Sequence, residues 1–241
     1  MEEEIYDKYQ FSEELEDLHR LHLVTKDFKH IIEYEPGSWK MFEPSKFVYS
    51  YFAFNTFYNF DWEESLKKNK LTLFSKKMKD DSEVEASESN KFRAMIDFIF
   101  NNISKEEKIE YVQFIKRPNK RENPKTNEIL IKSIEGITPD KKISENKREN
   151  FKKEFRKLIE TENCSQDEIK KDILGFIYLV RNNIFHGTKT TIEMSDKNQR
   201  ERIEIYSNIL IGINELLFKS LERVLQINFV KKYNLNLSGS N

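Results

Sequence analysis

The sequence is poor in cysteine, glycine and proline, and each shortage argues against a class of protein. Its 241 residues include one cysteine, six glycines and five prolines. A single cysteine, Cys164, cannot form a disulfide within the chain, which fits a reducing compartment. Few glycines and prolines argue against a turn-rich all-β fold and favour long helices. We therefore expect an all-α protein without a disulfide framework.

The chain also lacks long apolar runs and an excess of one charge. No run of about 18 uncharged apolar residues occurs, so we expect no membrane span. The first residues are acidic and lack the apolar core of a signal peptide, which makes the cytoplasm the expected location. The 41 basic and 42 acidic residues nearly cancel. This balance argues against a protein that coats nucleic acid broadly, but it permits a local basic cleft.

Aromatic residues are abundant, with 19 phenylalanines and 10 tyrosines. Large rings can supply much of the buried area of a core in a chain that is only 37% hydrophobic. Apolar spacing, capping residues and breakers predict helices over approximately these ranges: 12–22, 45–58, 91–102, 104–115, 144–160, 165–187 and 196–229. The segment Ile129–Ile137 is ambiguous between a helix turn and a short strand.

Two helix starts and one long helix carry clear signatures. Ser104 and Ser165 are each followed three positions later by a glutamate, which is the pattern of a capping box. The last helix has apolar residues at heptad spacing: Ile203, Leu210, Leu217 and Val224. The helix over 47–58 is apolar on most of its surface, so we expect it to be central. Together these elements predict an antiparallel helical bundle.

We divide the chain into an N-terminal helical extension (1–43), a helical domain (44–230) and a C-terminal tail (231–241). Asp80–Asn90 is polar and aperiodic, and we interpret it as a mobile loop. Arg117–Glu128 is a second expected loop. This loop and its start hold the basic side chains Lys116, Arg117, Lys120, Arg121 and Lys125. They either steer RNA toward a site or belong to an ordinary solvated loop.

Common catalytic and metal-binding motifs are missing. The chain has no glycine-rich phosphate loop, no His-Glu-x-x-His and no paired cysteines. Cys164 is a potential nucleophile, but its polar surroundings favour an exposed linker cysteine. His19 and His22 have the i, i+3 spacing of metal ligands, yet no carboxylate or cysteine is placed to complete the site. We therefore expect neither a metal nor a cofactor.

The segment Arg181–His186 differs from the rest of the chain in its chemistry. A long apolar helix ends in Arg181, Asn182, Asn183 and His186, followed by Gly187. The planar fork of arginine suits a phosphate, and histidine transfers protons near neutral pH. Asparagine can orient a phosphate, a ribose hydroxyl or the histidine. Such a set suffices for RNA cleavage without a metal ion.

A structural interpretation of the same residues stands beside the chemical one. Arginine near a helix C-terminus complements the helix dipole, and asparagine is a frequent capping residue. A histidine before a glycine can simply close the turn. The residues by themselves leave both interpretations open.

The segment Tyr178–Gly187 resembles the signature of HEPN domains, which are helical bundles whose active members are ribonucleases. That signature is an arginine, usually followed by a polar residue, with four to six positions in all before a histidine. Here Asn182 follows Arg181, and four residues in all separate Arg181 from His186. The run Phe52-Ala53-Phe54-Asn55-Thr56-Phe57-Tyr58 also resembles the first bundle helix of several such families. The resemblance covers roughly Pro44 to Phe229.

This resemblance implies a symmetric homodimer in which two Arg–His pairs meet at one RNA-binding cleft. Such proteins are commonly toxins or antiviral effectors that cut RNA without a metal ion, leaving a 2′,3′-cyclic phosphate and a 5′-hydroxyl. It gives His186 the proton-transfer role, Arg181 the phosphate role and Asn182 a supporting role. We add Asn183, from its position, and Lys189 as substrate-binding residues. An antitoxin or another regulatory protein is a further expected partner.

The alternative is a catalytically silent bundle that binds RNA or a partner protein and keeps the motif for structure. The complete set of arginine, polar residue and histidine favours the enzyme, because a silent protein has little need of all three.

Overall fold

A computed structural model describes residues 42–59, 88–116, 125–137, 143–161, 165–185, 193–194 and 196–225, with residues 19, 20 and 23. Its elements, in chain order, are α2 (Phe42–Asn59), α4 (Glu88–Asn101), α5 (Lys105–Ile115), α6 (Asn127–Glu135), α7 (Glu145–Thr161), α8 (Gln166–Glu168), the π-helical segment η3 (Ile169–Leu174), α9 (Gly175–Phe185) and α11 (Lys197–Leu225). These residues form helices and no strand, which confirms the all-α helical bundle. The ambiguous segment after Thr126 is helix α6.

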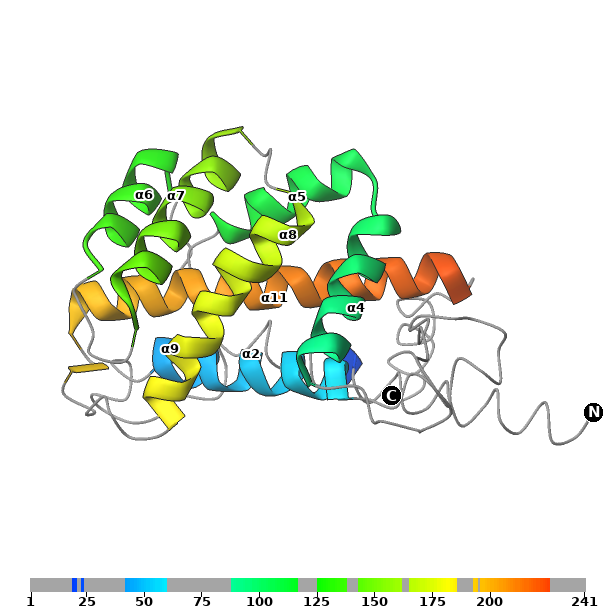
Figure 1. Ribbon diagram of the computed structural model, residues 1–241, viewed down its shortest axis with the longest axis horizontal. Helices are drawn as coiled ribbons and strands as arrows, with labels where there is room; N and C mark the ends of the chain where they lie inside the picture. The colour runs from blue at the N-terminus through cyan, green and yellow to red at the C-terminus, as the bar shows by residue number, and fades with distance from the viewer. Residues whose placement is uncertain are drawn as a thin grey trace, which may run out of the picture.

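Helix α11 is the central element of the bundle. It runs through the middle of the molecule, with α2 along one side and α5, α6 and α7 along the other (Figure 1). Every residue from 203 to 214 is buried. Because this stretch covers more than three helical turns, α11 is enclosed on every side. The predicted heptad positions Ile203 and Leu210 lie within this enclosed part, and Leu217, just after it, is buried as well.

Helix α2 is not central, and that prediction is wrong. Its aromatic side chains Tyr49 and Phe52 are 43% and 46% exposed. The opposite side of α2, which includes Phe47 and Tyr51, is buried. A helix that is apolar all round gives no sequence signal for its outward side, so the pattern cannot separate a central helix from one with an exposed aromatic face.

Neighbouring helices pack antiparallel over much of the bundle. The side-chain amide of Asn208 on α11 donates to the carbonyl oxygen of Ile115 on α5, 3.3 Å away. Further along α11, a Cβ atom on Gly212 would lie 2.5 Å from the ring of Tyr111. Glycine therefore allows α5 to approach α11 closely at this point. From the first contact to the second, the residue number rises along α11 and falls along α5, so the two helices are antiparallel, as predicted.

The pair formed by α2 and α11 is parallel instead. Glu43 lies 3.7 Å from Arg200 at the start of both helices. One turn later along α2, the ring centroid of Phe47 lies 6.4 Å from that of Tyr206. These two helices also share the most extensive contact between elements in the described chain. Elements far apart in the sequence are free of the short connections that force neighbours to reverse direction.

Both predicted capping boxes are present. The Ser104 hydroxyl accepts from the N–H of Glu107 at 3.2 Å, and the Glu107 carboxylate accepts from the N–H of Ser104 at 2.7 Å. The same reciprocal pair of bonds joins Ser165 and Glu168, with the same two distances. Each box satisfies two N–H groups that a helix start would otherwise leave without a partner.

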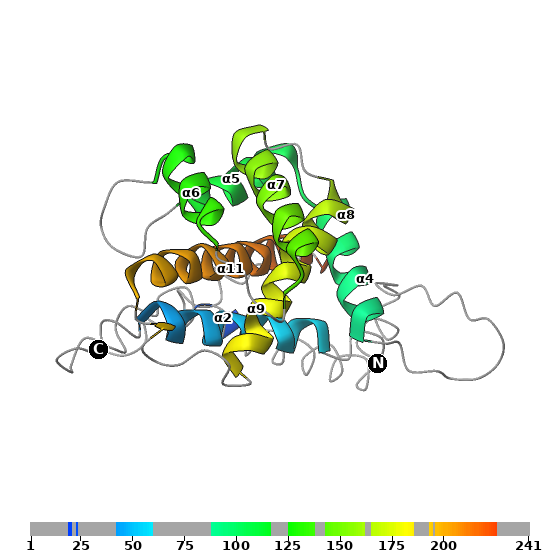
Figure 2. The ribbon, with the colours of Figure 1, turned by 60° about the vertical axis from the view of Figure 1, so that its left-hand side comes forward.

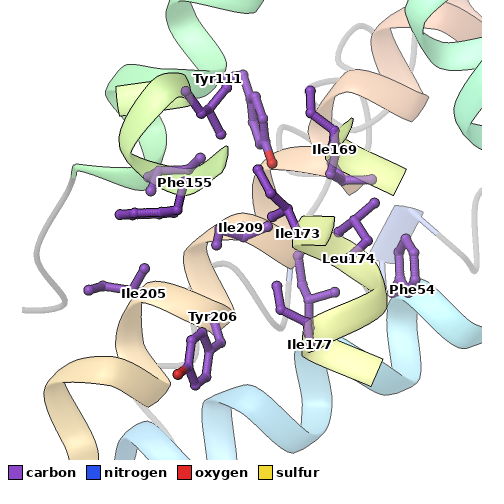
Figure 3. Packing of buried hydrophobic residues seen from close by; sticks show 14 of the residues in the cluster. Phe54, Tyr111, Phe155, Ile169, Ile173, Leu174, Ile177, Ile205, Tyr206 and Ile209 are labelled. Carbon is purple, nitrogen blue, oxygen red and sulfur yellow. The ribbon is translucent and has the colours of Figure 1, made fainter. Parts of the chain in front are cut away.

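Aromatic rings join α11 to the helices that surround it. The ring of Tyr206 makes edge contacts with Phe47 of α2, Phe151 of α7 and Phe176 of α9. Phe151 and Phe176 stack with their centroids 4.2 Å apart. Figure 3 shows how the apolar side chains of η3 and α9 gather beside Tyr206 and Ile209 in the same core.

The predicted N-terminal extension contributes to this core. His19 is 8% exposed, and its ring meets Phe218 of α11 edge-on, with 4.6 Å between centroids. Among the residues that the structure describes, no helix combines the length and the apolarity that a membrane span requires.

A buried asparagine on α11 provides a test of the central helix. Asn214 is completely buried, and neither of its amide atoms has a hydrogen-bond partner in the described structure. Asn214→Leu should raise the free energy of unfolding by about 1 kcal/mol, because it removes a desolvated amide without removing a bond. Urea denaturation followed by circular dichroism measures the change.

Asn208→Leu is the matched control, since Asn208 is also buried on α11 but donates to Ile115. It should lower the stability by about 1 kcal/mol. Equal losses in the two variants would show that the Asn214 amide is satisfied.

Candidate functional site

One continuous helical segment, α8 followed by η3 and α9, carries Arg181 to the surface of α2. It begins at the Ser165 capping box, whose Glu168 carboxylate also accepts from the Lys157 ammonium at 2.7 and 2.8 Å. The hydrogen bond from Lys157 and the N–H of Ser165 lower the pKa of Glu168 to about 2. The start of this segment is therefore fixed to α7, far from the end that bears Arg181.

The π-helical segment η3 sets the direction in which Arg181 points. Residues four apart advance by about 40° around an α-helix, so three such steps separate Ile169 from Arg181 by about 120°. A turn of π-helix contains roughly one more residue than a turn of α-helix. A four-residue step inside η3 therefore falls short of a full turn and offsets this advance. The row from Ile169 through Ile173 and Ile177 to Arg181 thus stays on one side. The three isoleucines are almost fully buried, and their row leads to Arg181.

Two tyrosine rings lie close to the guanidinium of Arg181. Its guanidinium carbon is 5.0 Å from the ring centroid of Tyr51 on α2 and 6.0 Å from that of Tyr178, one turn earlier on α9. Its Nη1 donates to the side-chain oxygen of Asn182 at 2.8 Å. The crossing of α9 over α2 brings these residues together (Figure 2).

The two rings differ in burial, which decides their contributions. Tyr51 is 2% exposed and Tyr178 is 39% exposed. A cation–π contact provides about 0.5–1 kcal/mol at an exposed site and about 2 kcal/mol when water is excluded. Tyr51 is therefore the main support of the guanidinium.

The structure brings two of the predicted site residues together. Arg181 and Asn182 are half-buried neighbours joined by a hydrogen bond. Asn183 lies in the last turn of α9, but its side chain falls outside the described part, as do His186 and Lys189. The assignments of these last three side chains stay predictions.

Sequence reasoning missed both tyrosines. Tyr178 stands three residues before Arg181, a spacing at which side chains on a helix are neighbours. The sequence could therefore have identified it as a partner of Arg181. Tyr51 comes from a helix far away in the sequence, and nothing in the chain marks it as a partner of Arg181.

No family model, curated protein or solved structure matches this chain. The resemblance to HEPN domains accordingly rests on the motif and its place at the end of an apolar helix. It stays a prediction.

One lysine of the basic loop, which was interpreted either as steering RNA or as an ordinary solvated loop, has a structural role. The Lys125 ammonium lies 2.8 Å from the Glu204 carboxylate, with both side chains largely buried. Its backbone N–H donates to the carbonyl oxygen of Lys116 at 3.0 Å and so closes the base of the loop. Asn127 and Glu128 belong to α6. Arg117, Lys120 and Arg121 lie outside the described residues.

The metal and nucleophile alternatives are only partly described. His19 packs against Phe218, while His22 and Cys164 lie outside the described part of the chain. In the described ranges, no group of three His, Cys, Asp or Glu residues is arranged to hold a metal ion.

A double-mutant cycle tests the support of Arg181 by Tyr51. Tyr51→Leu and Arg181→Met should show a coupling of about 1 kcal/mol in the free energy of unfolding, because each change alone removes the cation–π contact. Urea denaturation of the wild type, both single variants and the double variant gives this coupling.

The cycle between Tyr178→Leu and Arg181→Met is the control. It should show a smaller coupling, because this ring is farther away and more exposed. A coupling of zero for Tyr51, or a larger one for Tyr178, would contradict the assignment.

Proposed function

We propose that this protein is a metal-independent endoribonuclease of the HEPN type, acting in phage defence or as a toxin. The observation that carries the proposal is the placement of Arg181. An apolar helix delivers it, a buried ring supports it, and the adjacent Asn182 orients it. These contacts hold the guanidinium in place, and a phosphate clamp benefits from a fixed guanidinium plane.

Cleavage by such a site needs a cation at the phosphate and two proton transfers. Arg181 binds the scissile phosphate through its N–H groups and stabilises the charge of the phosphorane. The 2′-hydroxyl loses its proton and attacks phosphorus, and the bond from phosphorus to the 5′-oxygen breaks. The 5′-oxygen takes up a proton as it leaves. In a homodimer, one copy of His186 accepts the first proton and the other donates the second.

The outer face of α2 supports the homodimer. Tyr49 and Phe52 are both exposed, and their rings form an edge contact with 6.4 Å between centroids. Exposed aromatic pairs are typical of protein interfaces. Arg181 packs against Tyr51 on the other side of the same helix, so a second copy bound at this face would contact the helix that supports Arg181.

Cleavage of RNA by the purified protein is the primary test. Wild-type protein should cut total RNA in the presence of EDTA and leave 5′-hydroxyl ends, which polynucleotide kinase labels without prior phosphatase treatment. His186→Ala should reduce the rate by about 100-fold or more, because it removes the proton-transfer group.

Arg181→Lys keeps the charge but loses the planar fork, and it should also reduce the rate strongly. Circular dichroism must show unchanged helix content in both variants. Undiminished cleavage by His186→Ala would remove the catalytic assignment. RNA binding without cleavage by the wild type would favour the silent RNA-binding module instead.

A positive charge introduced on the outer face of α2 should weaken the proposed homodimer. Phe52→Lys should weaken dimer formation about tenfold or more, because it places a cation in an apolar interface. Analytical ultracentrifugation measures the association, and RNA cleavage should fall with it. Ile129→Lys on α6, where Ile129 is 51% exposed, is the control and should change neither quantity. A fully active Phe52→Lys monomer would show that one copy suffices.

A further inference from the structure

One exposed aromatic ring stands directly beside the arginine of the candidate site. Tyr178 is 39% exposed, whereas Phe176 and Ile177, its neighbours on the same helix, are almost completely buried. An exposed ring is common on protein surfaces and needs no explanation by itself. The position of this ring is what distinguishes it, since its centroid lies 6.0 Å from the Arg181 guanidinium.

A positive charge and an exposed aromatic ring at this separation match the two ends of one nucleotide. A nucleotide carries its anion and its flat base on a single ribose, which spans a distance of this order. Proteins that bind single-stranded nucleic acid combine cationic groups along the backbone with aromatic rings on which bases stack. The pair Arg181 and Tyr178 offers both within one turn of α9.

The two tyrosines around Arg181 face different surroundings. Tyr51 is buried under the guanidinium and supports it from the core. Tyr178 keeps more than a third of its surface in solvent. Because a ligand must approach from solvent, the ring that it can reach is Tyr178.

We propose that Tyr178 is a base-stacking platform for the nucleotide whose phosphate Arg181 binds. The proposal rests on the proposed RNA-cleaving function and adds a substrate-contacting residue to it. Stacking needs an unpaired base, so the substrate is unpaired at the cleaved position. Every base has a π-face, so Tyr178 adds affinity with little sequence preference.

The test separates stacking from a role of Tyr178 in a protein interface. The probe is a short fluorescein-labelled oligouridylate, and its binding to the full chain is measured by fluorescence anisotropy in the His186→Ala background, which prevents cleavage. Tyr178→Leu keeps an apolar side chain but loses the π-face, and it should weaken binding about tenfold. Tyr178→Phe keeps the ring and should bind far more tightly than Tyr178→Leu.

Two further measurements complete the experiment. Ile129→Ala changes another exposed apolar side chain, on α6, and should bind the oligouridylate as the background protein does. An oligonucleotide with 2-aminopurine at one position reports stacking directly, because its fluorescence falls when the base stacks. This quenching should occur with Tyr178 and Tyr178→Phe but not with Tyr178→Leu.

The outcomes are distinct. Equal binding and quenching by Tyr178→Leu and the background protein would overturn the stacking role and leave the proposed function intact. A change in oligomeric state in Tyr178→Leu, measured by ultracentrifugation, would assign the ring to an interface and also overturn it. If the background protein does not bind the oligouridylate and the wild type does not cleave RNA, the proposed function fails and the stacking role fails with it.

Discussion

Four aromatic rings, Phe47, Phe151, Phe176 and Tyr206, join helices that come from distant parts of the chain. Tyr206 contacts the other three from the central helix α11, and Phe151 stacks on Phe176. Each such pair adds about 0.5–1.5 kcal/mol to the free energy of burying its surface. Burial also raises the pKa of Tyr206, so its phenol stays neutral well above neutral pH.

The position of the candidate site depends on this junction. Phe176 is in the first turn of α9, and Arg181 follows just over one turn later on the same helix. Phe47 likewise fixes α2, whose next turn carries Tyr51. Because both anchors meet at Tyr206, the guanidinium and its supporting ring are held by the same packed core. Loss of this packing in the core would therefore move Arg181 out of its position over Tyr51.

Local signals in the sequence predicted the helices well. The boxes at Ser104 and Ser165 and the heptad of α11 depend on residues close together in the chain. The structure confirms both boxes and buries three of the four heptad residues, Ile203, Leu210 and Leu217. The central position of α11, the parallel direction of α2 and the π-turns of η3 were not predicted. These features arise from packing between distant segments, and α2 has no polar face from which its orientation could be inferred.

The candidate site likewise combines features that local sequence signals predicted with features that depend on distant segments. Its arginine and adjacent asparagine were predicted from spacing at a helix end, whereas Tyr51 arrives from another helix. Lys125 was assigned to a solvated or RNA-steering loop, but the buried Glu204 carboxylate binds it. A sequence shows where a charge occurs but not which distant charge compensates it.

The parallel pairing of α2 and α11 has a consequence for the synthesis of the chain. The two helices make the most extensive contact in the described structure, yet one lies near its beginning and the other at its end. A growing chain on the ribosome thus presents α2 long before its main partner exists. The ring that supports Arg181 gains its final surroundings only when α11 has emerged. This order of assembly postpones the complete arrangement of Arg181 over Tyr51 until α11 has been translated.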